Sequence, residues 1–157
     1  MKVELWLHGK TSDAYIAEGM ALYENRLKHY LQLQVSVLPP VKNAGKLPPQ
    51  QLMAKEAEIL LKQLNDSDFL VLLDERGKEL TSVKFANWLE QLQLQGNRRL
   101  VFVVGGAWGF DDSIRQRANF SLSLSKMTFS HQMVRLFFLE QLYRAMTIIR
   151  GEKYHNE

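Results

Sequence analysis

Three segments of the sequence carry residue types that could bind a small molecule or move a proton. Asp74 and Glu75 open a charged run, DERGKE over 74–79, which follows an apolar stretch with no spacer. Gly105 and Gly106 follow another apolar stretch, and glycines there would let a ligand approach the backbone because no Cβ intervenes. The third segment, SLSLSKMTFSH over 121–131, ends in His131 at the expected start of a helix.

His131 and Arg135 are four residues apart and therefore share one face of that helix. Exposed backbone N–H groups at a helix N-terminus, together with Arg and His side chains, favour an anion. Histidine is also the residue whose ordinary pKa suits proton transfer near neutral pH. The alternative is purely local: His131 makes a hydrogen bond nearby and Arg135 pairs with a carboxylate.

The other two segments also have ordinary structural interpretations. The charged run is compatible with a solvated loop, and the glycines with a tight turn between a strand and a helix. Neither G-x-G-x-x-G nor G-x-x-x-x-G-K-[ST] is present, so the sequence lacks the dinucleotide fingerprint and the phosphate loop.

Alternating strands and helices are predicted to position these segments. The runs at 69–73 and 100–104 are apolar throughout, as expected of strands buried on both faces of a parallel sheet. Strands are predicted at 3–7, 33–38, 69–73, 100–104 and 120–124, and helices from the cap Asp13 to Leu27, at 50–64, from Thr81 or Ser82 to Leu94, from Asp111 or Asp112, and at 133–149.

This alternation predicts one α/β domain over 1–157, with three layers and a mainly parallel sheet. The proline-containing stretch 39–49 is interpreted as a surface loop within that domain. In open α/β sheets the ligand site lies beyond the carboxyl ends of the strands. The rule selects three loops: 73–80, 105–111 and 124–130.

Composition narrows the class of protein. The 157 residues include no cysteine, so disulfides, thiolate metal sites and a cysteine nucleophile are excluded. Charged residues interrupt the longest apolar stretch, 133–149, so no membrane span is expected, and the N-terminus is too polar for a signal peptide. We therefore expect a cytoplasmic protein. The net charge of +3 arises in the second half, since 71–157 carry 12 basic and 9 acidic residues.

The helix at 133–149 has apolar residues around more than half of its circumference. Either it lies centrally in the core, or its second stripe faces a partner chain. The second option predicts a homodimer. The tail after it contains Tyr154 and His155, which would reach an active site if Gly151 turned the chain back over it.

Read together, these segments resemble the RlmH (YbeA-type) family of SPOUT-class methyltransferases, along the whole chain. The C-terminal run carries the resemblance most specifically. The matching residues are Leu73-Asp74, Gly77-Lys78, 102–106 with Gly109, 123–128, His131, Val134-Arg135, 140–145, Ile148-Ile149 and Tyr154-His155.

The resemblance implies a C-terminal trefoil knot, a homodimer and S-adenosylmethionine as methyl donor, with no metal. It makes His131, Arg135, Tyr154 and His155 the candidate catalytic residues. It places the donor against Leu73, Gly105, Gly106, Leu124, Ser125, Lys126, Met127, Thr128 and Phe129. Ser130 departs from the proline that the family usually has before its histidine, and Trp108 stands where relatives vary, so no role is assigned to it.

The resemblance further implies methylation of N3 of a pseudouridine in 23S ribosomal RNA (helix 69) on the assembled ribosome. The N3 proton must leave, and His131, His155 or a water could take it, while Arg135 or Arg144 could stabilise the resulting anion or bind phosphate. The mild charge suits a preassembled RNA–protein surface better than a bare duplex. Two alternatives remain: a non-catalytic RNA- or ribosome-binding module of the same fold, and a small-molecule nucleotide-binding enzyme.

Overall fold

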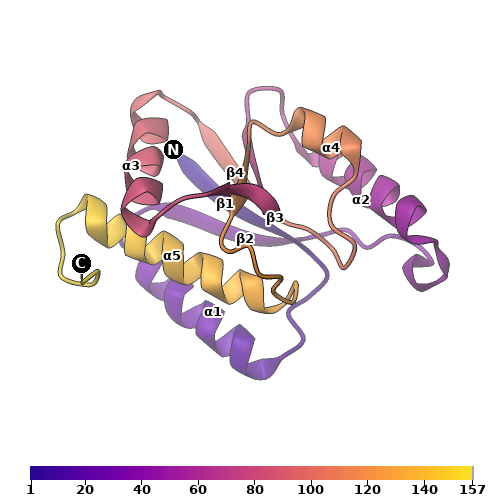
Figure 1. Ribbon diagram of the computed structural model, residues 1–157, viewed down its shortest axis with the longest axis horizontal. Helices are drawn as coiled ribbons and strands as arrows, with labels where there is room; N and C mark the ends of the chain where they lie inside the picture. The colour runs from indigo at the N-terminus through magenta and orange to yellow at the C-terminus, as the bar shows by residue number, and fades with distance from the viewer. Residues whose placement is uncertain (157) are drawn as a thin grey trace.

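A five-stranded sheet, parallel at every strand pair, forms the centre of the molecule in a computed structural model that describes residues 1–156 (Figure 1). The strand order is β2-β1-β4-β3-β5. The elements are β1 (Lys2–His8), α1 (Ala14–Leu27), β2 (Gln32–Leu38), the 3-10 turn η1 (Ala44–Lys46), α2 (Pro49–Gln63), β3 (Phe69–Glu79), α3 (Ser82–Leu94), β4 (Arg99–Val104), α4 (Asp112–Arg117), β5 (Phe120–Ser123) and α5 (Met133–Ile149).

Helices cover both faces of the sheet, which confirms the predicted three-layer α/β architecture. Helices α1, α3 and α5 pack on one face, and α2 and α4 on the other (Figure 1). Successive residues of β4 alternate between the two cores: Phe102 faces α5, whereas Val101 and Val103 face α2 and α4. Both central strands are therefore buried on both sides, as their apolar runs predicted.

Helix α5 occupies the predicted residues and lies between α1 and α3 on the sheet. Phe138 packs on Phe102 with ring centroids 4.6 Å apart, and Tyr143 packs on Tyr23 of α1 at 5.9 Å. Both apolar stripes thus have partners within one chain, although Phe137 stays exposed. The central position of α5 accounts for the two apolar stripes, so the stripes by themselves do not require a second chain.

Strand β3 is longer than predicted, which corrects the expected loop over 73–80. After an irregularity between Leu73 and Lys78, the chain pairs again with β5, Lys78 with Leu122 and Glu79 with Ser123. Gly77 permits this close return, because a Cβ there would lie 2.6 Å from the carbonyl oxygen of Ser121. Only a short arc between Leu73 and Lys78 remains free to line a site.

Two of the predicted helix caps are present. Thr81 accepts a hydrogen bond from the backbone N–H of Lys84 at 3.2 Å, and Asp111 accepts one from Ser113 at 2.7 Å. Asp13 occupies the position before α1, but its side chain makes no capping hydrogen bond. Within the described residues, no helix is long and apolar enough to cross a membrane.

Candidate functional site

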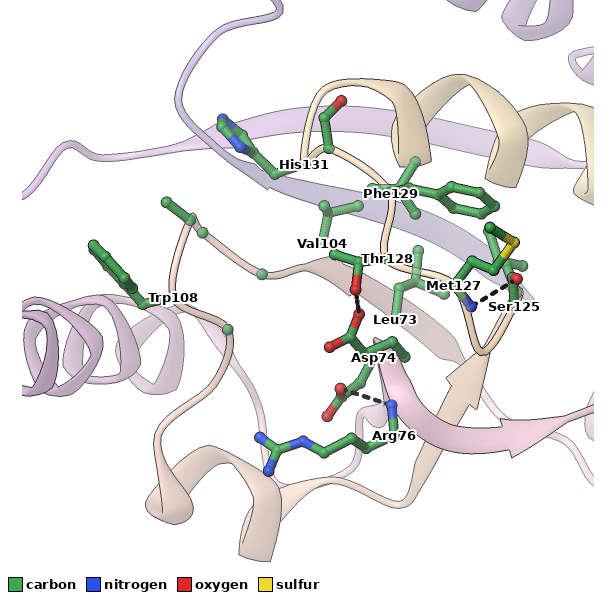
Figure 2. A pocket seen from close by; sticks show the side chains of 18 of the residues that line it. Leu73, Asp74, Arg76, Val104, Trp108, Ser125, Met127, Thr128, Phe129 and His131 are labelled. Atoms are coloured by element: carbon green, nitrogen blue, oxygen red, sulfur yellow. Dashed lines mark hydrogen bonds between the residues drawn. The ribbon is translucent and has the colours of Figure 1, made fainter.

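A pocket of about 610 Å³ opens at the carboxyl ends of β4 and β5, beside the irregular part of β3 that follows Leu73. Its walls come from residues 73–76, 104–109, Leu122, 124–125 and 127–131, with Val134 of α5 beside them (Figure 2). The three segments selected by the strand-end rule therefore meet at one cavity. Small-molecule sites typically have volumes of about 300–1,000 Å³, so the pocket has the size of a ligand site.

Gly105 and Gly106 form the wall that follows β4. A Cβ at Gly105 would lie 3.2 Å from the Phe110 ring, and one at Gly106 would lie 2.5 Å from Oε2 of Glu56. The missing side chains thus let this backbone segment pack against groups behind it, rather than only leaving room for a ligand. Gly109, with φ of +86°, closes the turn by donating its N–H to the carbonyl oxygen of Gly106 at 3.1 Å.

A buried pair of titratable groups lies behind Gly106. Oε2 of Glu56 is 3.4 Å from Nδ1 of His8, and Glu56 is only 9% exposed. Burial raises the pKa of Glu56 to about 7 and, with help from the Arg135 charge, lowers the pKa of His8 to about 4. Near pH 6 the pair is therefore a neutral acid beside a neutral imidazole.

Two carboxylates, those of Asp74 and Glu75, line the pocket. Asp74 pairs with the Arg115 guanidinium and also accepts a hydrogen bond from the backbone N–H of Arg76 at 3.1 Å. The hydroxyl of Thr128 donates to Glu75, so this contact joins the arc after Leu73 to the loop after β5 (Figure 2). These contacts hold two of the three segments in fixed relation to each other.

The loop after β5 is ordered by its own serines. Ser123 donates to the carbonyl oxygen of Ser125 at 2.8 Å, and Oγ of Ser125 accepts from the N–H of Met127 at 3.0 Å. Oγ of Ser130 accepts from the N–H of Met133 at 3.0 Å, so it caps the start of α5. Serine at the position where a proline is expected thus gives the helix a side-chain cap.

The pocket brings together most of the residues that sequence reasoning selected. Lys126 is the exception among the donor residues, since its side chain is 88% exposed and lies outside the lining, with its ammonium 3.8 Å from Glu79. Among the candidate catalytic residues, His131 lines the pocket. The predicted donor residues in the lining are Leu73, Gly105, Gly106, Leu124, Ser125, Met127, Thr128 and Phe129.

Arg135 points away from the pocket, into the protein. It is 1% exposed, and its guanidinium donates to the carbonyl oxygens of His131, Gly9 and His8 and to the hydroxyl of Thr11, each at 3.0 Å. With its donors directed to these groups, the side chain joins α5 to the end of β1. In its own chain, Arg135 therefore contacts the backbone around the start of α5 and not the pocket.

The C-terminal tail also lies outside the pocket of its own chain. Gly151, with φ of +68°, turns the chain back as expected, but onto α5 and α1. The Tyr154 hydroxyl donates to Glu140 at 3.0 Å. Burial, followed by the hydrogen bonds with Tyr23 and Glu140, raises the Tyr154 pKa. Nδ1 of His155 lies 3.3 Å from the Arg144 guanidinium. Residues 150–156 contribute nothing to the lining, so one chain does not unite the tail with His131.

Glu56 and Trp108 were not selected from the sequence. A signal for Glu56 exists, because it falls at helical spacing between Met53 and Leu60 on the face that packs against the sheet. Trp108 is 60% exposed and lines the pocket. Within residues 1–156, no group of three or more His, Asp or Glu side chains is placed to hold a metal ion.

Chemically, the site joins apolar surface to hydrogen-bonding backbone and two carboxylates. The family model described as "Predicted SPOUT methyltransferase" matches residues 1–155. The chain belongs to the SPOUT methyltransferase family. Similar proteins include ribosomal RNA large subunit methyltransferase H of Parabacteroides distasonis, 50% identical over 157 residues that cover all of both chains.

Two further relatives have the same name. That of Cytophaga hutchinsonii is 51% identical over 156 residues, covering 99% of this chain and 100% of the relative. That of Bacteroides fragilis is 45% identical over 157 residues, again all of both chains. The similarity of this SPOUT chain to these relatives therefore extends over the pocket, α5 and the tail together.

Proposed function

We propose that this protein methylates N3 of a pseudouridine in 23S ribosomal RNA (helix 69), on the assembled ribosome, with S-adenosylmethionine as donor. The observation that carries the proposal is the pocket itself, in which all three strand-end segments of a SPOUT chain converge. The names of the relatives support ribosomal RNA as the substrate. Such a substrate places the protein in the cytoplasm.

The residues present fit S-adenosylmethionine. Leu73, Leu124 and Phe129 offer apolar surface to a purine ring, and the backbone of 124–129 offers hydrogen-bonding groups to its edge. The carboxylate of Glu75 would favour the positive charge of the donor. When bound, the donor supplies a methyl group already activated on a sulfonium, so the protein's work is largely positioning and proton removal.

His131 is our assignment for the group that takes the N3 proton. It lines the pocket at the end opposite Met127 and Ser125 (Figure 2). A neutral imidazole there can accept the proton as the methyl group is transferred. Arg135 assists at one remove, because it donates to the His131 carbonyl oxygen at 3.0 Å and so fixes where α5 begins.

We also propose that the protein acts as a homodimer in which the tail of one chain completes the pocket of the other. Tyr154 and His155 lie on α5 near Glu140 and Arg144 in their own chain, away from the pocket. If these two residues serve the reaction, a second copy must bring them to it. Symmetric dimers commonly exchange such elements reciprocally.

The trefoil knot belongs to the same proposal. β5 lies beside β3 at the sheet edge, and the loop that follows it passes against both the arc after Leu73 and the glycine turn after β4. This arrangement is compatible with a chain threaded through an earlier loop at the donor site. Membership of the SPOUT family supports it.

Titration calorimetry with S-adenosylmethionine, followed by methyl transfer from labelled donor to ribosomes, tests the proposed function. Binding without transfer would favour a non-catalytic ribosome-binding module. Loss of donor binding on substitution of Leu124, with folding retained, would link the activity to this pocket.

A further inference from the structure

Trp108 leaves a large planar apolar surface open to solvent at the pocket. Its side chain is 60% exposed, although tryptophan is ordinarily well buried. The fold does not need it as core, since Phe110 supplies the buried aromatic ring that packs beneath this turn. An exposed indole in a pocket wall offers a surface on which a planar ligand can stack.

The turn that carries Trp108 is firmly anchored. Gly106 and Gly109 form an isolated bridge, so Ala107 and Trp108 are the two residues at its tip. Below the turn, Phe110 is 8% exposed and lies under the Arg115 guanidinium, whose carbon is 5.8 Å from the ring centroid. The indole is therefore presented from a fixed backbone, which lowers the entropy cost of binding a ligand on it.

Trp108 lies apart from the expected donor residues of β3 and of the loop after β5, whereas Gly105 and Gly106 precede it in the same turn. Figure 2 shows Trp108 and His131 toward one end of the pocket, with Leu73, Met127 and Ser125 toward the other. If the donor occupies the end with Leu73, the end with Trp108 is left for the methyl acceptor. The indole and the proposed base, His131, then face the same ligand.

We infer that Trp108 is a stacking platform for a nucleobase of the acceptor RNA, either the target base or its neighbour. An indole offers a π-face and one N–H donor, so it matches the face of a base and not a phosphate. Stacking on an aromatic side chain needs no particular base, so Trp108 contributes affinity and orientation while His131 acts on the N3 position. This inference rests on the proposed function, because it requires an RNA acceptor.

Four variants test this role. Trp108→Ala and Trp108→Leu remove the planar ring, Trp108→Phe keeps a smaller one, and Tyr15→Ala removes an equally exposed aromatic side chain, 62% exposed, on α1 outside the pocket. We expect kcat/KM for ribosomes to fall about tenfold or more in Trp108→Ala and Trp108→Leu. Trp108→Phe should stay within about threefold of the wild type, and Tyr15→Ala should match it.

Donor binding, measured by calorimetry, should be unchanged in all four variants. Wild-type kcat/KM in Trp108→Ala would overturn the inference, and so would an equal loss of donor affinity, since Trp108 would then belong to the donor site. If Trp108→Leu were as active as Trp108→Phe, the inference would also be overturned, because any apolar side chain would then serve as well as a planar ring. A wild-type protein that binds donor but does not methylate ribosomes would instead overturn the proposed function, and this inference with it.

Discussion

The guanidinium of Arg135 donates to the carbonyl oxygen of His8 across 3.0 Å and so ties the first turn of α5 to the end of β1. The same side chain reaches the carbonyl oxygen of His131, which lines the pocket. The position of the proposed base, His131, and the stability of the fold thus both depend on the buried guanidinium of Arg135. Burial lowers the pKa of Arg135, although arginine remains charged in proteins.

Arg135→Ala should destabilise the protein by about 3 kcal/mol or more, because several buried acceptors lose a charged donor. Urea unfolding measures this loss. Arg150→Ala is the matched control: Arg150 donates to the carbonyl oxygen of His29 at the exposed far end of α5 and should cost less than about 1 kcal/mol. If Arg135→Ala kept wild-type stability but lost activity, Arg135 would instead act directly on the reacting groups.

Gly77→Ala should break the second stretch of β3–β5 pairing. The new Cβ would meet the Ser121 carbonyl oxygen at 2.6 Å, and backbone atoms cannot move aside as a side chain can. We expect a loss of about 2 kcal/mol in the free energy of unfolding, together with weaker donor binding. Gly45→Ala, with no atom within 4 Å of the new Cβ, is the control that should leave both unchanged. Equal behaviour of the two variants would show that β3 does not return to β5.

Glu56 should make stability depend on pH. Its folded-state pKa, about 7, lies above the ordinary 4.5, so its contribution is complete below pH 4.5 and is lost as pH rises through 7. The glutamine in Glu56→Gln does not titrate. The free energy of unfolding of this variant, relative to that of the wild type, should therefore rise by about 2 kcal/mol between pH 5.5 and pH 8.5. Denaturant unfolding at both pH values measures this gain.

The neighbours of Glu56 define its control. His8 works in the opposite sense: its pKa is lowered to about 4, so its contribution is lost only as pH falls from 6.5 through 4. Asp111 and Arg135 are the other charged groups near the pair. Glu58→Gln, at a 62% exposed side chain on the same helix, should show no such change. If the difference in the free energy of unfolding between Glu56→Gln and the wild type were the same at both pH values, Glu56 would be ionised over this whole pH range.

A mixed dimer tests the contribution of the partner's tail. One chain would carry Ser125→Trp, which blocks the pocket, and the other would end at Gly151; each alone should be inactive. Co-expression at equal levels gives heterodimers as half of the population, each with one intact pocket served by an intact tail. Activity should therefore recover to about a quarter of the wild type. Stable heterodimers without recovered activity would assign each tail to its own chain.

Local patterns predicted much of this fold. The apolar runs at 69–73 and 100–104 identified strands buried on both faces, and the spacing of apolar residues located α5 at its observed ends. The continuation of β3 was missed because residues 74–79 are polar, and their pairing depends on β5, a partner some 45 residues away. Periodicity reports which face is apolar, and not which distant strand a polar segment will join.

The candidate site was predicted in its position and less well in its detail. The rule for parallel strand ends located the pocket, because strand direction alone determines where such loops meet. The role of Arg135 was harder to judge, although its spacing to Phe138, Leu139 and Leu142 places it on the buried stripe. Charge suggested a surface position, whereas two of its backbone acceptors, His8 and Gly9, lie at the end of β1, far away in sequence.

The proposed reaction is tested most directly by transfer of a labelled methyl group from S-adenosylmethionine to ribosomes that lack the modification. We expect about one methyl group per ribosome, found on N3 of a pseudouridine after digestion and mass spectrometry, with far less transfer to free ribosomal RNA. Absence of transfer by folded protein at saturating donor, or label on a different base, would contradict it.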